Sequence, residues 1–344
     1  MTRRAPSEIG ETFRQFVDWA RGRGWRYASA PIQLAHFERF LERRNVQSLT
    51  EIDAALLGEY QRALSITRST RTVNGYMSTL RALWRYLQCQ ELVVEDATGE
   101  LGRLRPDYFT PHLYSAHELL RIERGVCAAI ERARSSKHRL TCRMRRTAFG
   151  LLRDCGLRVS EACRLNVADY DRRARTLRIE HTKFFKTRVI PLPRSTCASL
   201  ERYLAYRQGV ATDTPSLFVS MFRRRLQRGA LESPFKQLLC EIGLYRSRRR
   251  RGRTVFGSTN LHALRHSYAV RTLERWQRQG CDVERLLPLL SSYMGHVKVT
   301  YTAHYLHLTP VLRQIASERF GNMVLSQLDG SRLRIDEAGI DNNE

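Results

Sequence analysis

Apolar side chains recur every three or four residues through the first 100 or so positions, which is the period of an amphipathic helix. Four helices are predicted, with apolar positions at Phe13, Phe16, Val17 and Trp19, at Leu34, Phe37, Phe40 and Leu41, over Ile52 to Leu64, and at Tyr76, Leu80, Leu83, Trp84 and Leu87. Ser69 and Thr70 form a cap signal before the last helix. Residues 1–104 are therefore predicted to form a helical domain.

The helical pattern stops between residues 105 and 112, where Pro106 and Pro111 interrupt it. We interpret residues 105–112 as a linker to a second domain at 113–328, which opens with a helix in the segment SAHELLRIERGVCAAIERA. The remaining residues, 329–344, are polar and acidic and are predicted to be a disordered tail.

The period changes to that of a strand at Leu177. LRIEHT and RVIPLP alternate or run apolar, and the turn KFFKT between them predicts an antiparallel hairpin. VADYD, just upstream, is a candidate third strand, and everything after about Ser199 is predicted to return to helix. The predicted fold class is mainly α with a small antiparallel β-sheet.

The charge of the chain points to a polyanionic partner. Its 344 residues carry 59 Lys and Arg against 34 Asp and Glu, a formal net charge of +25. Counterion release favours nucleic acid for a chain this basic. A signal peptide and a long apolar span are both lacking in the sequence. We therefore expect a protein of the cytoplasm, or of a nucleus, with no membrane partner.

Arginines gather on the predicted polar faces and in two basic runs, 223–225 and 248–251, which are expected to be exposed loops or helix ends that face DNA. The candidate DNA-contacting residues are Arg71, Arg81, Arg223, Arg224, Arg249 and Arg250. The eight cysteines are scattered without a CxxC pair, so they predict neither a zinc site nor a disulfide framework. We expect them to be small buried apolar residues.

Separated motifs of the second domain carry the candidate chemistry. In chain order they are GLRVSE at 156–161, TKF at 182–184, HALRH at 262–266, GH at 295–296 and Tyr305. Two guanidinium groups can grip the oxygens of a phosphate, and a tyrosine oxygen can attack the phosphorus. Because the free pKa of tyrosine is about 10, the attack needs a base or a cationic field, and histidine suits the role of base. This set of residues would cleave a phosphodiester without a metal.

Each motif is a weak signal by itself. Arg158 alone is typical of a surface ion pair, Lys183 of a solvated turn and Tyr305 of a half-buried core residue. His262 and His266 have the i, i+4 spacing of zinc ligands. However, Ala263 stands where a zinc protease carries its catalytic Glu, so the HExxH interpretation fails.

In combination and in this order, the motifs resemble the tyrosine recombinase (phage integrase) family. The resemblance covers the catalytic domain from about residue 113 to 325 and implies a two-domain clamp around double-stranded DNA. It assigns catalytic roles to Arg158, Lys183, His262, Arg265, His296 and Tyr305, with Glu161 in support of Arg158. Lys186 is a second candidate lysine, and Tyr301 is a second candidate tyrosine one helical turn before Tyr305.

The resemblance also implies a reaction. The tyrosine forms a 3′-phosphotyrosyl enzyme, the ester stores the energy of the broken bond, and no metal or nucleotide cofactor is needed. Exchange between two duplexes implies a tetramer on paired DNA, with accessory recombinases or DNA-binding proteins as further candidate partners. Apolar residues after Tyr305, among them Val311 and Phe320, predict a helix that packs either on its own catalytic domain or, as the resemblance implies, on a neighbouring protomer. YLHLTP and the segment before it favour a member carried by a mobile element.

Two alternatives stay open. A type IB topoisomerase uses the same covalent chemistry but relaxes a single duplex, and the HxxR and GH motifs favour a recombinase over it. The other alternative is a catalytically silent DNA-binding protein on the same fold, which the complete set of candidate residues disfavours.

Overall fold

The computed structural model describes residues 8–25, 28–180, 187–209, 214–220 and 222–308 of the chain. These residues fall into two compact units, Met1–Tyr108 and Phe109–Glu344, and each is described by itself. The division lies inside the stretch 105–112 that the sequence marks as a linker. The predicted tail and the apolar segment after Tyr305 lie outside the described residues.

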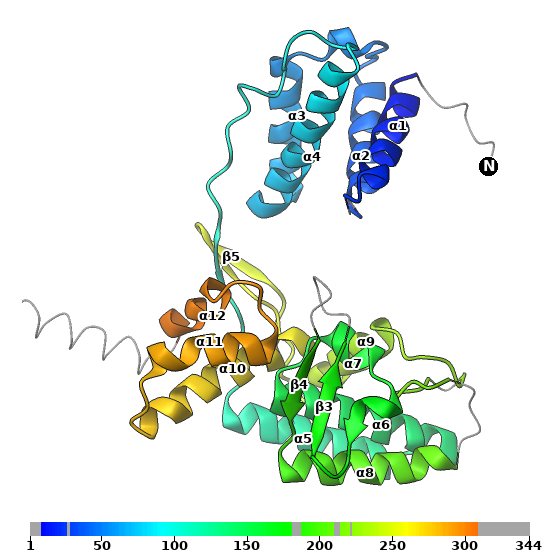
Figure 1. Cartoon of the computed structure of the whole chain (residues 1–344), viewed down its shortest axis with the longest axis vertical. Helices are drawn as coiled ribbons and strands as arrows, with labels where there is room; N and C mark the ends of the chain where they lie inside the picture. The colour runs from blue at the N-terminus through cyan, green and yellow to red at the C-terminus, as the bar shows by residue number, and fades with distance from the viewer. Residues whose placement is uncertain (1–7, 26–27, 181–186, 210–213, 221, 309–344) are drawn as a thin grey trace, which may run out of the picture. The chain divides into compact units, whose positions relative to one another are not determined.

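The first unit is a helical domain (Figure 1). Its helices are α1 (Glu8–Gly22), α2 (Ala30–Glu42), α3 (Ala54–Thr67) and α4 (Thr70–Cys89), with a 3-10 turn η1 (Leu49–Glu51). All four predicted helices are confirmed, and the Ser69 side chain caps α4 by accepting from the Thr72 N–H. Phe16, Phe37 and Trp84 are fully buried in a common apolar core.

The second unit is also mostly helical. Its helices are α5 (Ala116–Glu131), α6 (Ser136–Cys155), α7 (Val159–Arg164), α8 (Arg194–Gln208), α9 (Gly229–Glu241), α10 (Leu261–Arg278), α11 (Val283–Met294) and α12 (Thr300–Ala303), with 3-10 turns η2 (Val167–Asp169) and η3 (His304–Leu308). The helix predicted at the start of the domain is α5, whose capping box pairs Ser115 with Glu118. Helix α6 packs against α5, α8 and α10, and apolar residues of the GLRVSE and HALRH segments share one core with it.

The predicted hairpin is confirmed as part of a three-stranded sheet in the order β2-β3-β4. Its strands are β2 (Tyr170–Asp171), β3 (Thr176–Ile179) and β4 (Arg188–Pro191), and Leu177 lies opposite Ile190 in the antiparallel pair. The prediction of a strand over VADYD is half right. Residues 167–169 form η2 because the Asp169 carboxylate accepts from the Asn166 N–H at 2.7 Å, and the strand starts only at Tyr170.

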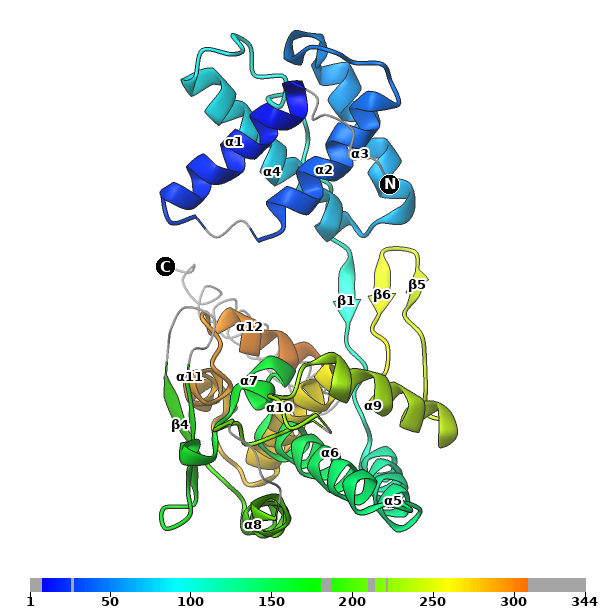
Figure 2. The same cartoon turned by 90° about the vertical axis from the view of Figure 1, so that its right-hand side faces the viewer.

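A second sheet contradicts the expectation that everything after Ser199 is helical. It has the order β1-β6-β5, with β1 (Tyr108–Thr110), β5 (Arg249–Arg251) and β6 (Thr254–Phe256), and Figure 2 shows these strands side by side. The prediction of a loop or helix end at 248–251 is therefore wrong for β5, because three consecutive arginines show no apolar alternation and the strand forms only by pairing with β6. A two-residue turn makes the hairpin, and Gly252 takes its first position with φ of 55°.

The cysteines divide by burial. Those buried in the second unit are Cys142, Cys155, Cys163 and Cys197, as expected. Cys127 is half-buried, and Cys89, Cys240 and Cys281 are exposed, so the expectation of burial is wrong for these last three. Cys89 is the last residue of α4 and Cys240 lies one residue before the end of α9, and helix ends are open to solvent.

Candidate active site

Four segments that are distant in sequence meet around the candidate catalytic residues. Arg158 is the N-cap of α7, and α10 begins at Leu261, where the Asn260 side chain accepts from the Ala263 N–H at 3.0 Å. Helix α10 then carries His262 and, one turn later, Arg265 and His266. Gly295 ends α11 with φ of 66°, a left-handed conformation suited to glycine, and directs the chain into His296.

Arg265 is the buried centre of this arrangement, with 1% of its surface exposed. One terminal nitrogen donates to the Gly156 carbonyl at 2.5 Å and the other to the Met294 carbonyl at 2.6 Å. The side chain therefore joins the end of α6 to the end of α11. Burial, and then the charge of Arg158, lower the pKa of Arg265 to about 9, so it is still a cation at neutral pH.

Arg158 shares a carboxylate with a second arginine. Glu161, 2% exposed, accepts from the Arg158 side chain at 2.7 Å and from Arg188 at 3.1 and 2.9 Å. Burial by itself would raise the pKa of Glu161, but the hydrogen bonds and charge of Arg188 and the Arg158 N–H outweigh it and lower this pKa to about 2. Arg158 also donates to the Gly295 carbonyl at 2.8 Å. The prediction that Glu161 supports Arg158 thus has a direct contact behind it.

Arg188 links the hairpin to the same group. It opens β4, and its Nε donates to the Tyr293 carbonyl at 2.7 Å. A Cβ added at Gly295 would come within 2.6 Å of the Arg188 guanidinium, so glycine is needed there for space as well as for conformation. Glu161, α11 and β4 are therefore fastened to one another through a single side chain.

The two candidate tyrosines lie in different environments. Tyr305 is 4% exposed, whereas Tyr301 is 58% exposed. The Tyr305 hydroxyl lies 2.8 Å from Nδ1 of His266, and its ring is nearly parallel to the His296 ring at 6.4 Å between centroids. Burial raises the pKa of Tyr305, while the charges of Arg265 and Arg158 act in the opposite direction.

The three histidines are neutral at pH 7. Burial, with the charges of Arg265 and Arg158, lowers the pKa of His262 to about 4, although this residue is also exposed to solvent. Burial, followed by His262 and Arg265, lowers the pKa of His266 to about 3. Burial and the neighbouring arginines lower the pKa of His296 to about 3, and its Nδ1 lies 2.7 Å from the Thr302 hydroxyl.

The structure therefore brings together Arg158, Glu161, His262, Arg265, His296 and Tyr305. Lys183 and Lys186 both lie outside the described residues. Two members of the cluster were missed by the sequence reasoning, Arg188 and His266. The spacing of His266 from His262 was a signal, because i, i+4 residues share a helix face. Arg188 carried no such signal, since its partners are distant in sequence.

The candidate DNA-contacting arginines differ in their exposure. The exposed ones are Arg71, Arg223, Arg224, Arg249 and Arg250. Arg81 instead donates to the Leu101 carbonyl and is partly buried. Arg249 and Arg250 lie on β5, where Arg250 donates to the Gly252 carbonyl at 3.0 Å.

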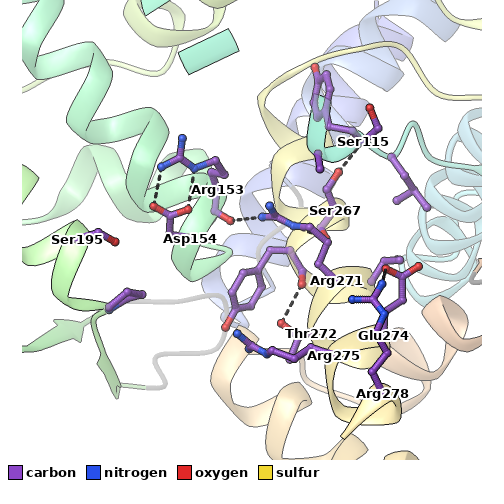
Figure 3. A pocket seen from close by; sticks show the side chains of 16 residues that line it. Ser115, Arg153, Asp154, Ser195, Ser267, Arg271, Thr272, Glu274, Arg275 and Arg278 are labelled. Atoms are coloured by element: carbon purple, nitrogen blue, oxygen red, sulfur yellow. Dashed lines mark hydrogen bonds and ion pairs between the residues drawn. The ribbon is translucent and has the colours of Figure 1, made fainter. Parts of the chain in front are cut away.

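A cavity of about 880 Å³ lies on another side of α10 (Figure 3). Its lining residues bond to one another: Arg271 donates to the Arg153 carbonyl at 2.9 Å, and Ser267 accepts from the Tyr114 N–H at 2.7 Å. None of the candidate catalytic residues that the structure describes lines it. Over the described ranges, no cluster of His, Cys, Asp and Glu is arranged to hold a metal ion. None of the described helices has the length and apolar character needed to span a membrane.

Comparison with known proteins gives consistent results. A profile of the phage integrase family matches residues 128–311. An integrase/recombinase of Sinorhizobium fredii, y4rB, is 35% identical over 317 residues, which cover 90% of this chain and 96% of that protein. The tyrosine recombinase XerC of Chlamydia trachomatis serovar L2 is 27% identical over 72% of this chain and 70% of its own.

Solved structures share the fold. The Tn1549 transposon integrase, in complex with transposon right-end DNA, superposes with a TM-score of 0.65 at 17% identity, over 90% of this chain and 99% of that one. The site-specific recombinase XerH, bound to a palindromic difH substrate, gives a TM-score of 0.64 at 19% identity, over 85% of this chain and 78% of its own.

Proposed function

The chain belongs to the phage integrase family, and on that premise we propose that it cuts and rejoins DNA at specific sites through a 3′-phosphotyrosyl link to Tyr305. The observation that carries the proposal is the position of the Tyr305 hydroxyl. It is buried, it lies 2.8 Å from a histidine nitrogen, and its pKa responds to the charges of Arg158 and Arg265. Tyr301 is exposed, and its ring meets the His296 ring edge to face with the centroids 6.4 Å apart.

The two arginines are proposed to hold the scissile phosphate. In each arginine, both terminal nitrogens donate one hydrogen bond to the protein. Those of Arg158 go to Glu161 and to the Gly295 carbonyl, and those of Arg265 go to two carbonyls. A guanidinium has five N–H groups, so further donors remain for the non-bridging oxygens. Because the donors are fixed by the fold before the phosphate arrives, they stabilise the developing charge without reorganisation.

In the proposed cleavage, the Tyr305 oxygen bonds to phosphorus and the bond from phosphorus to the 5′ oxygen breaks. Lys183 supplies the proton that makes the leaving group a 5′ hydroxyl. The 5′ hydroxyl of a partner strand then attacks the phosphotyrosyl ester and frees Tyr305, so neither metal nor nucleotide is consumed. Exchange between two duplexes needs four such sites, which a tetramer on paired double-stranded DNA would provide.

Transposition or integration of a mobile element is the proposed setting. The support is the likeness in fold to a transposon integrase whose structure contains transposon-end DNA. The exposed arginines of the β5–β6 hairpin are proposed as additional phosphate contacts, since strands carrying arginine can follow a DNA backbone.

The nucleophile is tested by two matched variants. Tyr305→Phe keeps the ring but lacks the attacking oxygen, so it is expected to bind DNA and to form no covalent adduct on a nicked target duplex. Tyr301→Phe is the control and should form the adduct at the wild-type rate. An adduct with Tyr305→Phe, or its loss in Tyr301→Phe alone, would refute the assignment. Plasmid relaxation set against a two-site recombination assay separates a recombinase from a topoisomerase.

A further inference from the structure

The histidines around Tyr305 differ in whether they can exchange a proton with its hydroxyl. His266 places Nδ1 at 2.8 Å from the hydroxyl oxygen. His296 faces the tyrosine ring with its own ring, and its Nδ1 is engaged by Thr302. His262 meets the His266 ring edge to face, with centroids 4.6 Å apart and an interplanar angle of 85°. Of these three histidines, the one within proton-transfer distance of the hydroxyl is therefore His266.

We propose that His266 is a further catalytic residue, which accepts the phenolic proton of Tyr305 during strand cleavage, and that His262 is a positioning residue for it. This inference rests on the proposed function and deepens it. The sequence motifs had pointed to His262 and His296 as the catalytic histidines. Here the role of base for Tyr305 belongs to His266.

The proton balance is simple. In the reactive form, His266 carries its hydrogen on Nε2 and presents the lone pair of Nδ1 to the Tyr305 hydroxyl. As the bond from oxygen to phosphorus forms, the proton passes to Nδ1, and the departing 5′ oxygen takes a separate proton from Lys183. When the partner strand attacks the ester, the imidazolium returns its proton to the tyrosine oxygen. The cycle therefore ends with Tyr305 and His266 as they began.

The surroundings of His266 make this transfer dependent on DNA. The groups that act on it are His262 and Arg265 from α10, His296 from the turn after α11, and His304 with Tyr305 from η3. Burial and these neighbours lower the pKa of His266, and burial raises the pKa of Tyr305, so the proton stays on the tyrosine in the free protein. A phosphate between the arginines would offset part of their charge and strengthen His266 as a base.

His262 restricts the orientation of the His266 ring. It lies one helical turn before His266, and its ring packs edge to face on that ring. An aromatic pair of this geometry restricts rotation of both rings, since other orientations lose the contact. Packing of this kind would hold Nδ1 of His266 toward Tyr305.

The test uses asparagine, whose amide group falls where Nδ1 of histidine lies. His266→Asn can still accept the hydrogen bond of Tyr305 through its carbonyl oxygen, but it cannot take the proton. Single-turnover adduct formation on a nicked duplex is expected to fall about 10²- to 10⁴-fold, the usual contribution of a general base. DNA binding and the melting temperature should stay at wild-type values. A rate within about threefold of wild type overturns the proposal.

The variant His266→Ala distinguishes loss of the base from loss of activity through misfolding. The space left by the ring should admit free imidazole, and the rate should rise with the concentration of the unprotonated imidazole, which a misfolded protein would not show. Failure of imidazole to restore any activity, with folding and DNA binding intact, also overturns the proposal. His262→Asn should lower the rate less than His266→Asn, and the reverse order would move the base to His262.

The two levels of the proposal fail differently. If the wild-type protein forms no adduct, or if Tyr305→Phe forms one, the proposed function is wrong. If the wild type forms the adduct through Tyr305 and His266→Asn does so equally fast, only the inference about His266 is wrong.

Discussion

The core of the first unit and the centre of the second are both buried, but the first consists of apolar side chains and the second of charged ones. In the first, side chains such as Phe16, Phe37 and Trp84 pack among themselves. In the second, Arg265 and Glu161 are as deeply buried as those aromatics and are surrounded by directed hydrogen bonds. An apolar core needs volume and area, whereas a buried charge needs partners at defined positions.

The difference shows what each region is organised to do. Apolar packing is roughly proportional to area and tolerates exchanges of similar volume, so it gives stability with little demand on direction. A buried ion network is a poor source of stability, because taking charges out of water costs about as much as their attraction returns. Its value here lies in orientation, since the same contacts that satisfy Arg158 and Arg265 also aim them.

Removal of a central aromatic should therefore affect folding most. Trp84→Ala is expected to lower the free energy of unfolding of the first unit by about 3–5 kcal/mol, the range for deletion of a buried large side chain. Urea unfolding followed by far-UV circular dichroism measures the change. Trp25→Ala is the matched control, because Trp25 is 46% exposed against 1% for Trp84, and it should cost less than about 1 kcal/mol. Equal costs would show that burial does not set the stability of this unit.

Acid should act on the second unit through Glu161. Its pKa falls from 4.5 to about 2 on folding, so its contribution is complete above pH 4.5 and is lost as the pH falls toward 2. A shift of this size corresponds to about 3 kcal/mol. The free energy of unfolding of Glu161→Gln, measured in urea at several pH values, should lack this part of the acid dependence. Parallel curves for the variant and the wild type would contradict the prediction.

Loss of Arg188 should affect rate more than stability. Arg188→Met leaves Glu161 to Arg158 alone and releases the Tyr293 carbonyl, so adduct formation is expected to fall about 10- to 100-fold through misplacement of the catalytic groups. A substrate with a bridging 5′ sulfur should not restore the rate, although it should restore that of Lys183→Ala. Arg178→Met, at a half-exposed position on β3, is the control and should be close to wild type. Rescue by sulfur would instead connect Arg188 to the leaving group.

The contrast also explains what the sequence could predict. The four helices of the first unit follow directly from apolar spacing, because Phe13, Phe16 and Val17 face the core for the same reason that they recur. The order of GLRVSE, HALRH, GH and tyrosine was enough for the family and for residues that the fold does bring together. In both cases the signal is local in the chain.

What the sequence could not predict depends on distant partners. Arg188 gains its place from Glu161 and Tyr293, which lie 27 and 105 residues away. Strand β5 exists because it pairs with β6, and its own residues, Arg249 to Arg251, have no strand pattern. The choice of Tyr305 over Tyr301 rested on spacing alone, because the different burial of the two side chains depends on segments distant in sequence.

The grip of Arg265 on two carbonyl oxygens has a consequence for protein engineering. Main-chain oxygens are present whatever side chain a residue carries, so the hydrogen bond from Arg265 to the carbonyl at position 294 does not depend on the side chain there. Another apolar side chain of similar volume could therefore replace the buried Met294 and leave this hydrogen bond intact. Position 156 lacks this freedom: Gly156 has φ of 61°, and an added Cβ would lie 2.4 Å from Tyr268. A library of variants aimed at altered target sites can therefore vary position 294 and should keep Gly156.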